Sequence, residues 1–199
     1  MKAPIEFYFD FSSPYGYLAS TRIDALAAKH GRSVNWRPIL LGPAFKAMGA
    51  PILAHTPLKG DYSMRDFPRS ARFHGIAYNQ PSEFPVSTLA AARVFYWLKE
   101  RNEKMAVAFA KAIFAAFFVD GVNVSVPESV IRVAVSVGCR PDDVRAALEN
   151  QAVKDKTRAE VEGALAKGVF GSPYIVVDGE PFWGMDRLDQ VERWLEKPF

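Results

Sequence analysis

Strand-forming sequence lies near the two ends of this chain, and a long helical stretch separates them. Near the N-terminus, residues 5–11 and 34–39 are rich in aromatic and β-branched residues, with a helical pattern between them. Near the C-terminus, residues 174–177 and 180–183 flank Asp178-Gly179, a pair typical of a two-residue hairpin turn. Neither end is large enough to bury a core alone, so we expect the two ends to pair with each other.

The middle of the chain is mainly helical in pattern. Residues 42–61 carry Gly, Pro and Lys and predict a loop, whereas residues 62–74 predict a helix that Pro68 breaks or kinks. Ser125 and Glu128 have the spacing of a capping box. The other expected helices cover residues 86–101, 103–119, 125–138 and 152–167, with a short one from Pro141.

The order of the elements is strand, helix, strand, then many helices, then strand, strand and a helix over residues 186–196. The first two strands should be parallel, joined by a right-handed crossover. This is the order of a thioredoxin-like α/β fold that carries a large all-helical insertion. We expect residues 1–41 and 168–199 to form the discontinuous thioredoxin-like domain, and residues 42–167 to form the helical insertion domain.

Charge and hydropathy exclude several classes of protein. Lysine and arginine number 25 against 22 acidic residues, and the basic residues are spread along the chain, which predicts no nucleic-acid partner. No apolar stretch approaches the length of a membrane helix, so we expect no membrane partner. The first strand begins within a few residues of the N-terminus with no leader pattern before it, so we expect a cytoplasmic protein.

Cysteine and histidine give no support for a metal or disulfide site. Cys139 is the only cysteine, so an internal disulfide, a CxxC pair and a thiolate metal site are all excluded. The three histidines, His30, His55 and His74, have no metal-ligand spacing. We therefore expect no metal.

Ser13-Pro14 marks the start of the first helix. A serine hydroxyl caps free N–H groups, and proline suits the first helical position. A helix N-terminus also stabilises an anion, so a thiol bound there would have its pKa lowered. Ser13 is therefore either a helix cap alone or a cap that also binds sulfur, with Ser12 as the neighbouring alternative. No His or Asp forms an activating motif that would make Ser13 a nucleophile.

Three motifs together carry a family resemblance. The segments Phe9-Asp10-Phe11-Ser12-Ser13-Pro14-Tyr15, Phe170-Gly171-Ser172-Pro173-Tyr174 and Phe182-Trp183-Gly184-Met185-Asp186-Arg187-Leu188 resemble the motifs of the 2-hydroxychromene-2-carboxylate isomerase family. That family is similar to the kappa-class glutathione transferases and, more distantly, to bacterial disulfide oxidoreductases. The resemblance spans essentially the whole chain and implies glutathione as cofactor and a homodimer.

The resemblance implies roles at the ends of the sheet. It implies that Ser13 binds and activates the glutathione sulfur, where a disulfide oxidoreductase would carry a cysteine. It implies that Pro173 is cis and that the Ser172 backbone pairs with the cysteinyl backbone of glutathione. Family members often have an apolar residue in place of Ser172, but a backbone contact would survive the change.

Other residues are expected to hold the γ-glutamyl end of glutathione. The N–H groups of Met185 and Asp186 would hold its carboxylate. Asp186 or Asp66 would meet its ammonium group, and Lys59 resembles the family lysine near the ligand. Alternatively, Asp186 is a helix N-cap, and Lys59 and Asp66 are ordinary solvated charges.

Tyr15 and Trp183 could form the walls of an aromatic substrate pocket, although aromatic residues at such positions more often belong to a core. Family members often have asparagine where this chain has Ser87-Thr88, which weakens any transfer of substrate contacts there.

The resemblance implies a glutathione-dependent cis-trans isomerisation in aromatic-hydrocarbon catabolism, with a small aromatic carboxylate as substrate. Transient addition of the thiolate would turn a double bond into a single bond and allow rotation. Lys59 or Arg187 could hold the substrate carboxylate. The alternatives are a kappa-like glutathione transferase or peroxidase, and a non-catalytic thioredoxin-like binding protein. Because Cys139 is not at the start of the first helix, a disulfide oxidoreductase is excluded.

Overall fold

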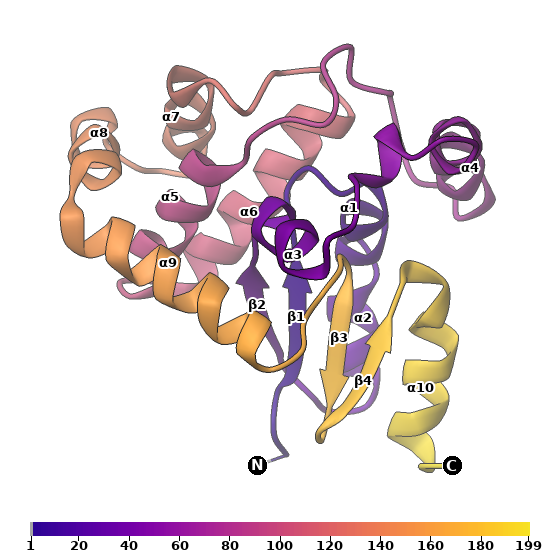
Figure 1. Ribbon diagram of the computed structural model, residues 1–199. Helices are drawn as coiled ribbons and strands as arrows, with labels where there is room; N and C mark the ends of the chain where they lie inside the picture. Colours follow the sequence, from indigo (N-terminus) through magenta and orange to yellow (C-terminus); the bar gives the residue numbers. More distant parts are fainter. Residues whose placement is uncertain (1) are drawn as a thin grey trace.

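The computed structural model describes residues 2–199 and has a four-stranded sheet built from both ends of the chain (Figure 1). The strand order is β2-β1-β3-β4, with β1 and β2 parallel and the other neighbours antiparallel. The strands are β1 (Ile5–Phe9), β2 (Val34–Pro38), β3 (Tyr174–Val177) and β4 (Glu180–Trp183). The predicted thioredoxin-like fold, with its many helices between the two halves of the sheet, is confirmed. The exact domain boundaries stay a prediction.

Helices surround this sheet. Those of the two chain ends are α1 (Pro14–Ser20), α2 (Ile23–Lys29), the 3₁₀ turn η2 (Met185–Arg187) and α10 (Leu188–Glu196). Those of the central part are α3 (Leu41–Met48), η1 (Leu53–His55), α4 (Lys59–Phe73), α5 (Leu89–Lys99), α6 (Glu103–Phe118), α7 (Pro127–Ser136), α8 (Pro141–Glu149) and α9 (Gln151–Ala166). Within residues 2–199, none of these helices is long and apolar enough to cross a membrane.

Strand β1 connects the sheet to the helical core. Its alternate residues Ile5, Phe7 and Phe9 are fully buried, as expected for a strand with one face in a core. The ring of Phe114 on α6 lies 5.4 Å from the ring of Phe9 and 5.3 Å from the ring of Phe11. The sheet and the central helices therefore share one hydrophobic core, whose burial is the main stabilising contribution to the fold.

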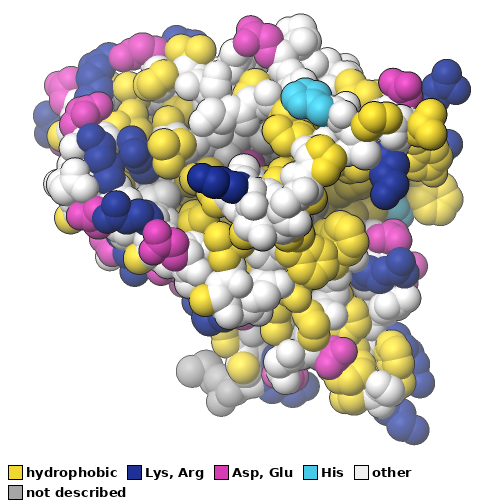
Figure 2. All heavy atoms as spheres, viewed as in Figure 1, with side chains coloured by type: hydrophobic (Ala, Val, Ile, Leu, Met, Phe, Trp, Pro, Cys, Tyr) yellow, Lys and Arg dark blue, Asp and Glu magenta, His cyan; other side chains and the backbone are white. Residues whose placement is uncertain are grey.

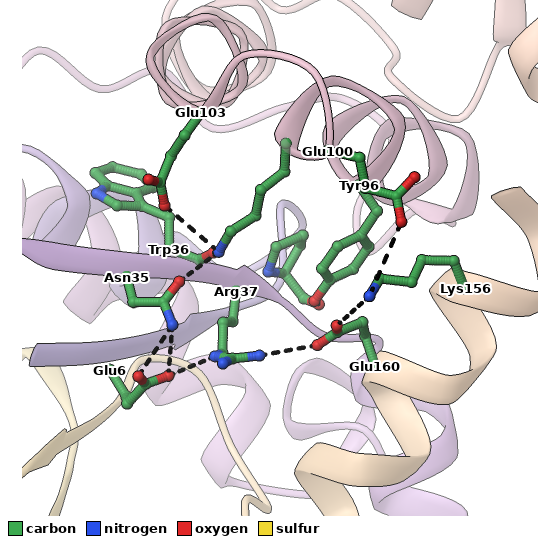
Figure 3. Close-up of polar contacts among 11 residues, drawn as sticks. Glu6, Asn35, Trp36, Arg37, Tyr96, Glu100, Glu103, Lys156 and Glu160 are labelled. Atoms are coloured by element: carbon green, nitrogen blue, oxygen red, sulfur yellow. Dashed lines mark hydrogen bonds and ion pairs between the residues drawn. The ribbon is translucent and has the colours of Figure 1, made fainter. Parts of the chain in front are cut away.

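A polar network connects α9 to the face of β1 and β2 that lies opposite Ile5, Phe7 and Phe9 (Figure 3). Arg37 on β2 forms an ion pair with Glu6 on β1 and donates to Glu160 on α9 at 2.9 Å. Glu160 also pairs with Lys156 at 3.1 Å, and Lys99 on α5 donates to the carbonyl of Trp36 at 2.7 Å. These contacts tie the edge strand β2 to helices from the central part of the chain.

The single helix expected after Ser13 is in fact two helices. Ser20 and Thr21 donate their hydroxyls to the carbonyls of Tyr17 and Leu18, at 2.6 and 2.8 Å. Such side-chain bonds compete with the helical backbone and favour an end at this point. The break between α1 and α2 follows from these local bonds.

The loop expected over residues 42–61 is wrong, because α3 and η1 lie there and α4 begins at Lys59. No local side chain caps α3; instead its Leu41 N–H donates to the carboxylate of Asp10, 2.7 Å away. An acid at a helix N-terminus is stabilising, but here it comes from a distant part of the chain. Local sequence could not reveal this cap.

Two further details of the helices differ from expectation. Helix α4 is assigned as one helix through Pro68. The capping box at Ser125 is wrong, because the Ser125 hydroxyl donates to Asn123 Oδ1 at 2.6 Å and α7 begins without a side-chain cap. The hairpin turn at Asp178-Gly179 is confirmed, with both residues at positive φ.

Candidate functional site

Ser13 lies at the N-terminus of α1, where its role as a helix cap is confirmed. Its backbone is extended, and its Oγ accepts from the N–H of Gly16 at 3.0 Å. Pro14 fills the first helical position and has no N–H to satisfy. The Tyr15 N–H is then left as a first-turn donor with no hydrogen-bond partner within residues 2–199.

The Ser13 hydroxyl also connects α1 to the loop before β3. It donates to the backbone carbonyl of Ser172 at 2.9 Å, and the Ser172–Pro173 peptide is cis, as predicted. Two motifs far apart in the sequence therefore meet at one point. The Ser172 N–H makes no hydrogen bond within the part of the chain that the structure describes, whereas its carbonyl is engaged by Ser13.

The close approach of the two segments requires glycine at position 16. An ideal Cβ on Gly16 would lie only 2.7 Å from Ser172 Oγ and 3.1 Å from Ser13 Cβ. The Ser172 hydroxyl is itself fixed, because it accepts from the Asp10 N–H at 2.9 Å. The serine that departs from the usual apolar residue therefore has a hydrogen-bonding role in this chain.

Asp10 is a buried carboxylate whose role was not predicted from the sequence. It is 4% exposed and accepts from Ser12 N–H at 2.8 Å, Leu41 N–H at 2.7 Å and Thr88 Oγ1 at 2.8 Å. Burial raises the pKa of Asp10, although the three hydrogen bonds oppose this effect. Asp10 thus joins the end of β1 to the starts of α3 and α5. The sequence signals were an acid directly after an apolar strand and its place in the first of the three motifs.

Asp66 and Tyr15 meet between α1 and α4. Tyr15 donates its hydroxyl to Asp66 at 2.6 Å, and Arg69 and Ser70 also donate to this carboxylate. Burial raises the pKa of Asp66, but these hydrogen bonds outweigh it and hold the pKa below its usual value. The Tyr15 ring is half-buried against Phe67, with centroids 5.0 Å apart. Both side chains are therefore already committed to contacts within the protein.

Lys59 is exposed at the start of α4, and its ammonium group makes no ion pair within residues 2–199. The residue before it, Leu58, has φ 64° and ψ −46° and is 86% exposed. The Lys59 N–H donates to the Pro57 carbonyl at 2.7 Å, which closes a strained γ-turn. Exposed hydrophobic side chains also line α4, at the right of Figure 2.

Met185 and Asp186 form a short turn that packs against α1, the helix that also contacts α4. Gly184 before them has φ 116°, and an ideal Cβ there would lie 2.4 Å from Asp186 Oδ1. The N–H groups of Met185 and Asp186 make no hydrogen bonds within the described residues 2–199. The Asp186 carboxylate is largely exposed, and its one ion-pair partner within residues 2–199 is Arg187, at 3.2 Å.

The alternative interpretation of Asp186 as the cap of the last helix is wrong. Helix α10 begins at Leu188 with Arg187 in the cap position, and no side chain caps it. Asp186 instead lies within η2, with its carboxylate folded back over Gly184. This leaves the Asp186 carboxylate exposed, with the Arg187 guanidinium as its ion-pair partner.

Trp183 lies on the surface beside the cis-proline loop. It is 57% exposed, and its ring lies 4.9 Å from that of Phe170. An ideal Cβ on Gly171 would lie 2.2 Å from Trp183 Nε1, so the indole covers the backbone just before Ser172. Trp183 therefore presents an aromatic surface next to the loop that contacts Ser13.

The structure unites some of the predicted residues and separates others. Ser13 contacts the Ser172 carbonyl of the cis Ser172–Pro173 peptide, and Tyr15 contacts Asp66. No hydrogen bond within residues 2–199 joins Lys59, Asp186 or Trp183 to Ser13. No group of His, Cys, Asp and Glu within the described chain has the arrangement of a metal site. The free N–H groups around the α1 N-terminus suit an anionic peptide-like ligand.

Comparison with known proteins supports the resemblance. The sequence pattern that defines a DSBA-like thioredoxin domain matches residues 4–196. The chain is 30% identical to a 2-hydroxychromene-2-carboxylate isomerase from Sphingobium xenophagum, over 98% of this chain and 99% of that protein. It is 26% identical to glutathione S-transferase kappa 2 from Caenorhabditis elegans, over 98% of this chain and 92% of that protein.

A solved structure of a 2-hydroxychromene-2-carboxylate isomerase superimposes with a TM-score of 0.87 at 28% identity, and the match covers 97% of this chain and 94% of the other. The sequence and structural matches agree along nearly the whole length. The chain therefore belongs to the family of DsbA-like thioredoxin domains, and its relatives there include 2-hydroxychromene-2-carboxylate isomerases and kappa glutathione transferases.

Proposed function

We propose that this protein is a glutathione-dependent isomerase of the 2-hydroxychromene-2-carboxylate type, acting as a cytoplasmic homodimer in aromatic-hydrocarbon catabolism. The observation that carries the proposal is the contact between Ser13, at the start of α1, and the cis-proline loop at Ser172. A serine there has no redox chemistry of its own, so a bound thiol would supply the reactive sulfur. The named relatives are isomerases and transferases.

The groups around α1 fit glutathione. Its cysteinyl backbone suits the Ser172 N–H, and its γ-glutamyl carboxylate suits the N–H groups of Met185 and Asp186, all of which lack partners within residues 2–199. Its ammonium group suits the exposed carboxylate of Asp186. Asp66 is a weaker candidate for that contact, because Tyr15, Arg69 and Ser70 already donate to it.

Glutathione, when bound, supplies a sulfur nucleophile that adds reversibly to an unsaturated carbon and so permits rotation about the former double bond. Ser13 would turn its hydroxyl proton from the Ser172 carbonyl toward this sulfur. The free Tyr15 N–H and the positive end of α1 would further stabilise negative charge there. Asp10 would hold Ser172 in place through its backbone N–H.

The aromatic carboxylate substrate would lie on the exposed side of this site. Trp183 offers an aromatic face beside the cis-proline loop, and the hydroxyl of Tyr15 is already engaged by Asp66. The Lys59 ammonium group is free of ion pairs within residues 2–199, whereas Arg187 pairs with Asp186. Lys59 is therefore the better of the two predicted partners for the substrate carboxylate.

A kappa-like glutathione transferase is the second candidate, favoured by the similarity to glutathione S-transferase kappa 2 over 98% of this chain. The same sulfur site would serve both reactions. The two are separated by whether glutathione is recovered unchanged or conjugated to the product.

The test is an isomerisation assay with 2-hydroxychromene-2-carboxylate and reduced glutathione. We expect turnover that requires glutathione, and a loss of roughly 10²-fold in kcat/KM in Ser13→Ala because one hydrogen-bond donor to the reacting sulfur is removed. Ser12→Ala is the matched control and should stay near the native rate. Turnover without glutathione, or a Ser13→Ala variant as active as the native protein, would overturn the proposal. Conjugation without isomerisation would favour the transferase.

A further inference from the structure

A second candidate site is a cavity of about 380 Å³ between α3, α5 and α9. This volume lies within the range of small-molecule sites. Apolar side chains form much of its wall. They are Leu40 just before α3, Pro43 on α3, Leu89 on α5, and Val161 and Leu165 on α9. None of the residues assigned above to the glutathione site lines this cavity.

Arg93 on α5 provides the unusual feature of this cavity. Its Nε is buried and has no hydrogen-bond partner within residues 2–199, and its guanidinium makes no ion pair there. The residues on either side, Ala92 and Val94, are fully buried. Arg93 also lines the cavity, and the protein within residues 2–199 supplies no acceptor for its guanidinium, so an acceptor on a ligand would be its first partner.

Among the cations that line the cavity, Arg93 is the one without an ion pair within residues 2–199. Lys154 pairs with Glu149 at 3.2 Å, and Arg158 pairs with Asp155. Basic and acidic side chains alternate over α8 and α9 at the left of Figure 2. Glu162 also lines the cavity, but its side chain is solvent-exposed. Its negative charge disfavours a ligand with several negative charges.

We propose that this cavity binds a monoanionic organic acid. The carboxylate would pair with the guanidinium of Arg93, whose planar donors match a carboxylate. The apolar body of the ligand would lie against Leu89, Val161 and Leu165. This proposal is independent of the glutathione site, because it uses none of the residues proposed to bind glutathione.

The test is calorimetric titration of the full chain with 2-naphthoate, its neutral isostere 2-naphthamide, and sulfate. We expect 2-naphthoate to bind, and 2-naphthamide and sulfate to bind at least about tenfold more weakly, because each lacks the anionic or the apolar contact. Arg93→Met should weaken naphthoate binding about tenfold or more. The control Arg72→Met changes an exposed arginine on α4 and should bind as the native chain does.

A second variant guards against misfolding of Arg93→Met. Leu165→Trp keeps the charge but fills the cavity, and it should also abolish naphthoate binding while its circular dichroism stays native. Saturating glutathione should not displace naphthoate, which separates this cavity from the glutathione position. Lys59→Met should bind naphthoate as the native chain does, whereas weaker binding would place the ligand at the proposed substrate position beside Ser13 and overturn the proposal. The proposal is overturned if native protein shows no naphthoate binding, if naphthamide binds equally, if both cavity variants bind normally, or if glutathione competes.

Discussion

The two halves of the candidate site differ in how their polar groups are used. In the buried half, Ser13, Ser172 and Asp10 are each less than a tenth exposed. Ser13 donates to the Ser172 carbonyl, and the Ser172 hydroxyl accepts from the Asp10 N–H. In the exposed half, Trp183 is 57% exposed and the Lys59 ammonium group makes no ion pair within residues 2–199. The buried half fixes geometry, whereas the exposed half keeps charge and surface for a ligand. Substitutions in the first should alter stability, except that Ser13 should also affect the bound sulfur, and those in the second should alter binding.

The largest loss of stability is expected for Asp10→Ala. It leaves the N–H groups of Ser12 and Leu41 and the hydroxyl of Thr88 without their buried acceptor. We expect the free energy of unfolding to fall by roughly 2–4 kcal/mol. Urea denaturation followed by circular dichroism measures this. A change below about 0.5 kcal/mol, the usual size of a surface effect, would contradict the central role of Asp10.

The pH dependence of stability gives a second test of Asp10. Its pKa is raised by burial, so the folded state binds the proton more tightly than the unfolded state does. The corresponding stability is fully present below the unfolded pKa, near 3.8, and is lost as the pH rises through the folded pKa. Denaturation at several pH values should show this loss of stability with rising pH in the native chain and not in Asp10→Asn. Equal slopes would refute the assignment.

Gly16→Ala should have the next largest effect. The new Cβ would meet Ser172 Oγ at 2.7 Å, and we expect a loss of roughly 1–2 kcal/mol after the helix-propensity gain of alanine is subtracted. The matched control is Gly163→Ala on α9, where an added Cβ would meet nothing within 4 Å among residues 2–199 beyond its chain neighbours and the nearby backbone of its own helix, and a gain of about 0.5–1 kcal/mol is expected. A double-mutant cycle with Ser172→Ala should recover part of the loss. Identical effects at the two glycines would show that the contact is not tight.

Tyr15→Phe should be milder. It removes one donor from the Asp66 carboxylate and should cost about 1 kcal/mol at neutral pH. Because the pKa of Asp66 is lowered in the folded state, this contribution is present above the unfolded pKa and is lost as the pH falls through the folded pKa. Measuring native and variant stability at neutral and acidic pH checks the sign. A difference that grows in acid would contradict this role for the contact.

Lys59→Met and Asp186→Asn should have the smallest effects on stability, within about 0.5 kcal/mol, because both side chains are exposed. Each should weaken glutathione or substrate binding. If either variant lost stability but bound glutathione and substrate normally, the exposed half would serve stability rather than binding, contrary to this account.

Motifs near the strands were predictable from sequence, because their signals are local. The serine-proline helix start, the Asp178-Gly179 turn and the alternation in β1 each rest on neighbouring residues. The resemblance also led to the correct cis peptide before Pro173.

The missed helix α3 and the tight contact at Gly16 arose where distant residues determine the structure, whereas the break after Ser20 and the failed capping box at Ser125 come from local side-chain bonds. Helix α3 was missed because its first N–H is capped by Asp10, far away in the sequence. The cost of a change at Gly16 depends on Ser172, which is equally distant. The unpaired guanidinium of Arg93 is visible only after α5 and α9 are packed together.

The most direct test of the account is titration of the folded chain with reduced glutathione, with thiolate absorbance followed over a range of pH. The account predicts binding, a bound thiol whose pKa lies below that of free glutathione, and loss of that shift in Ser13→Ala. Ser12→Ala should retain it. Failure of the folded native chain to bind glutathione, or the same thiol pKa in native and Ser13→Ala proteins, would contradict the claim that Ser13 activates a bound thiol.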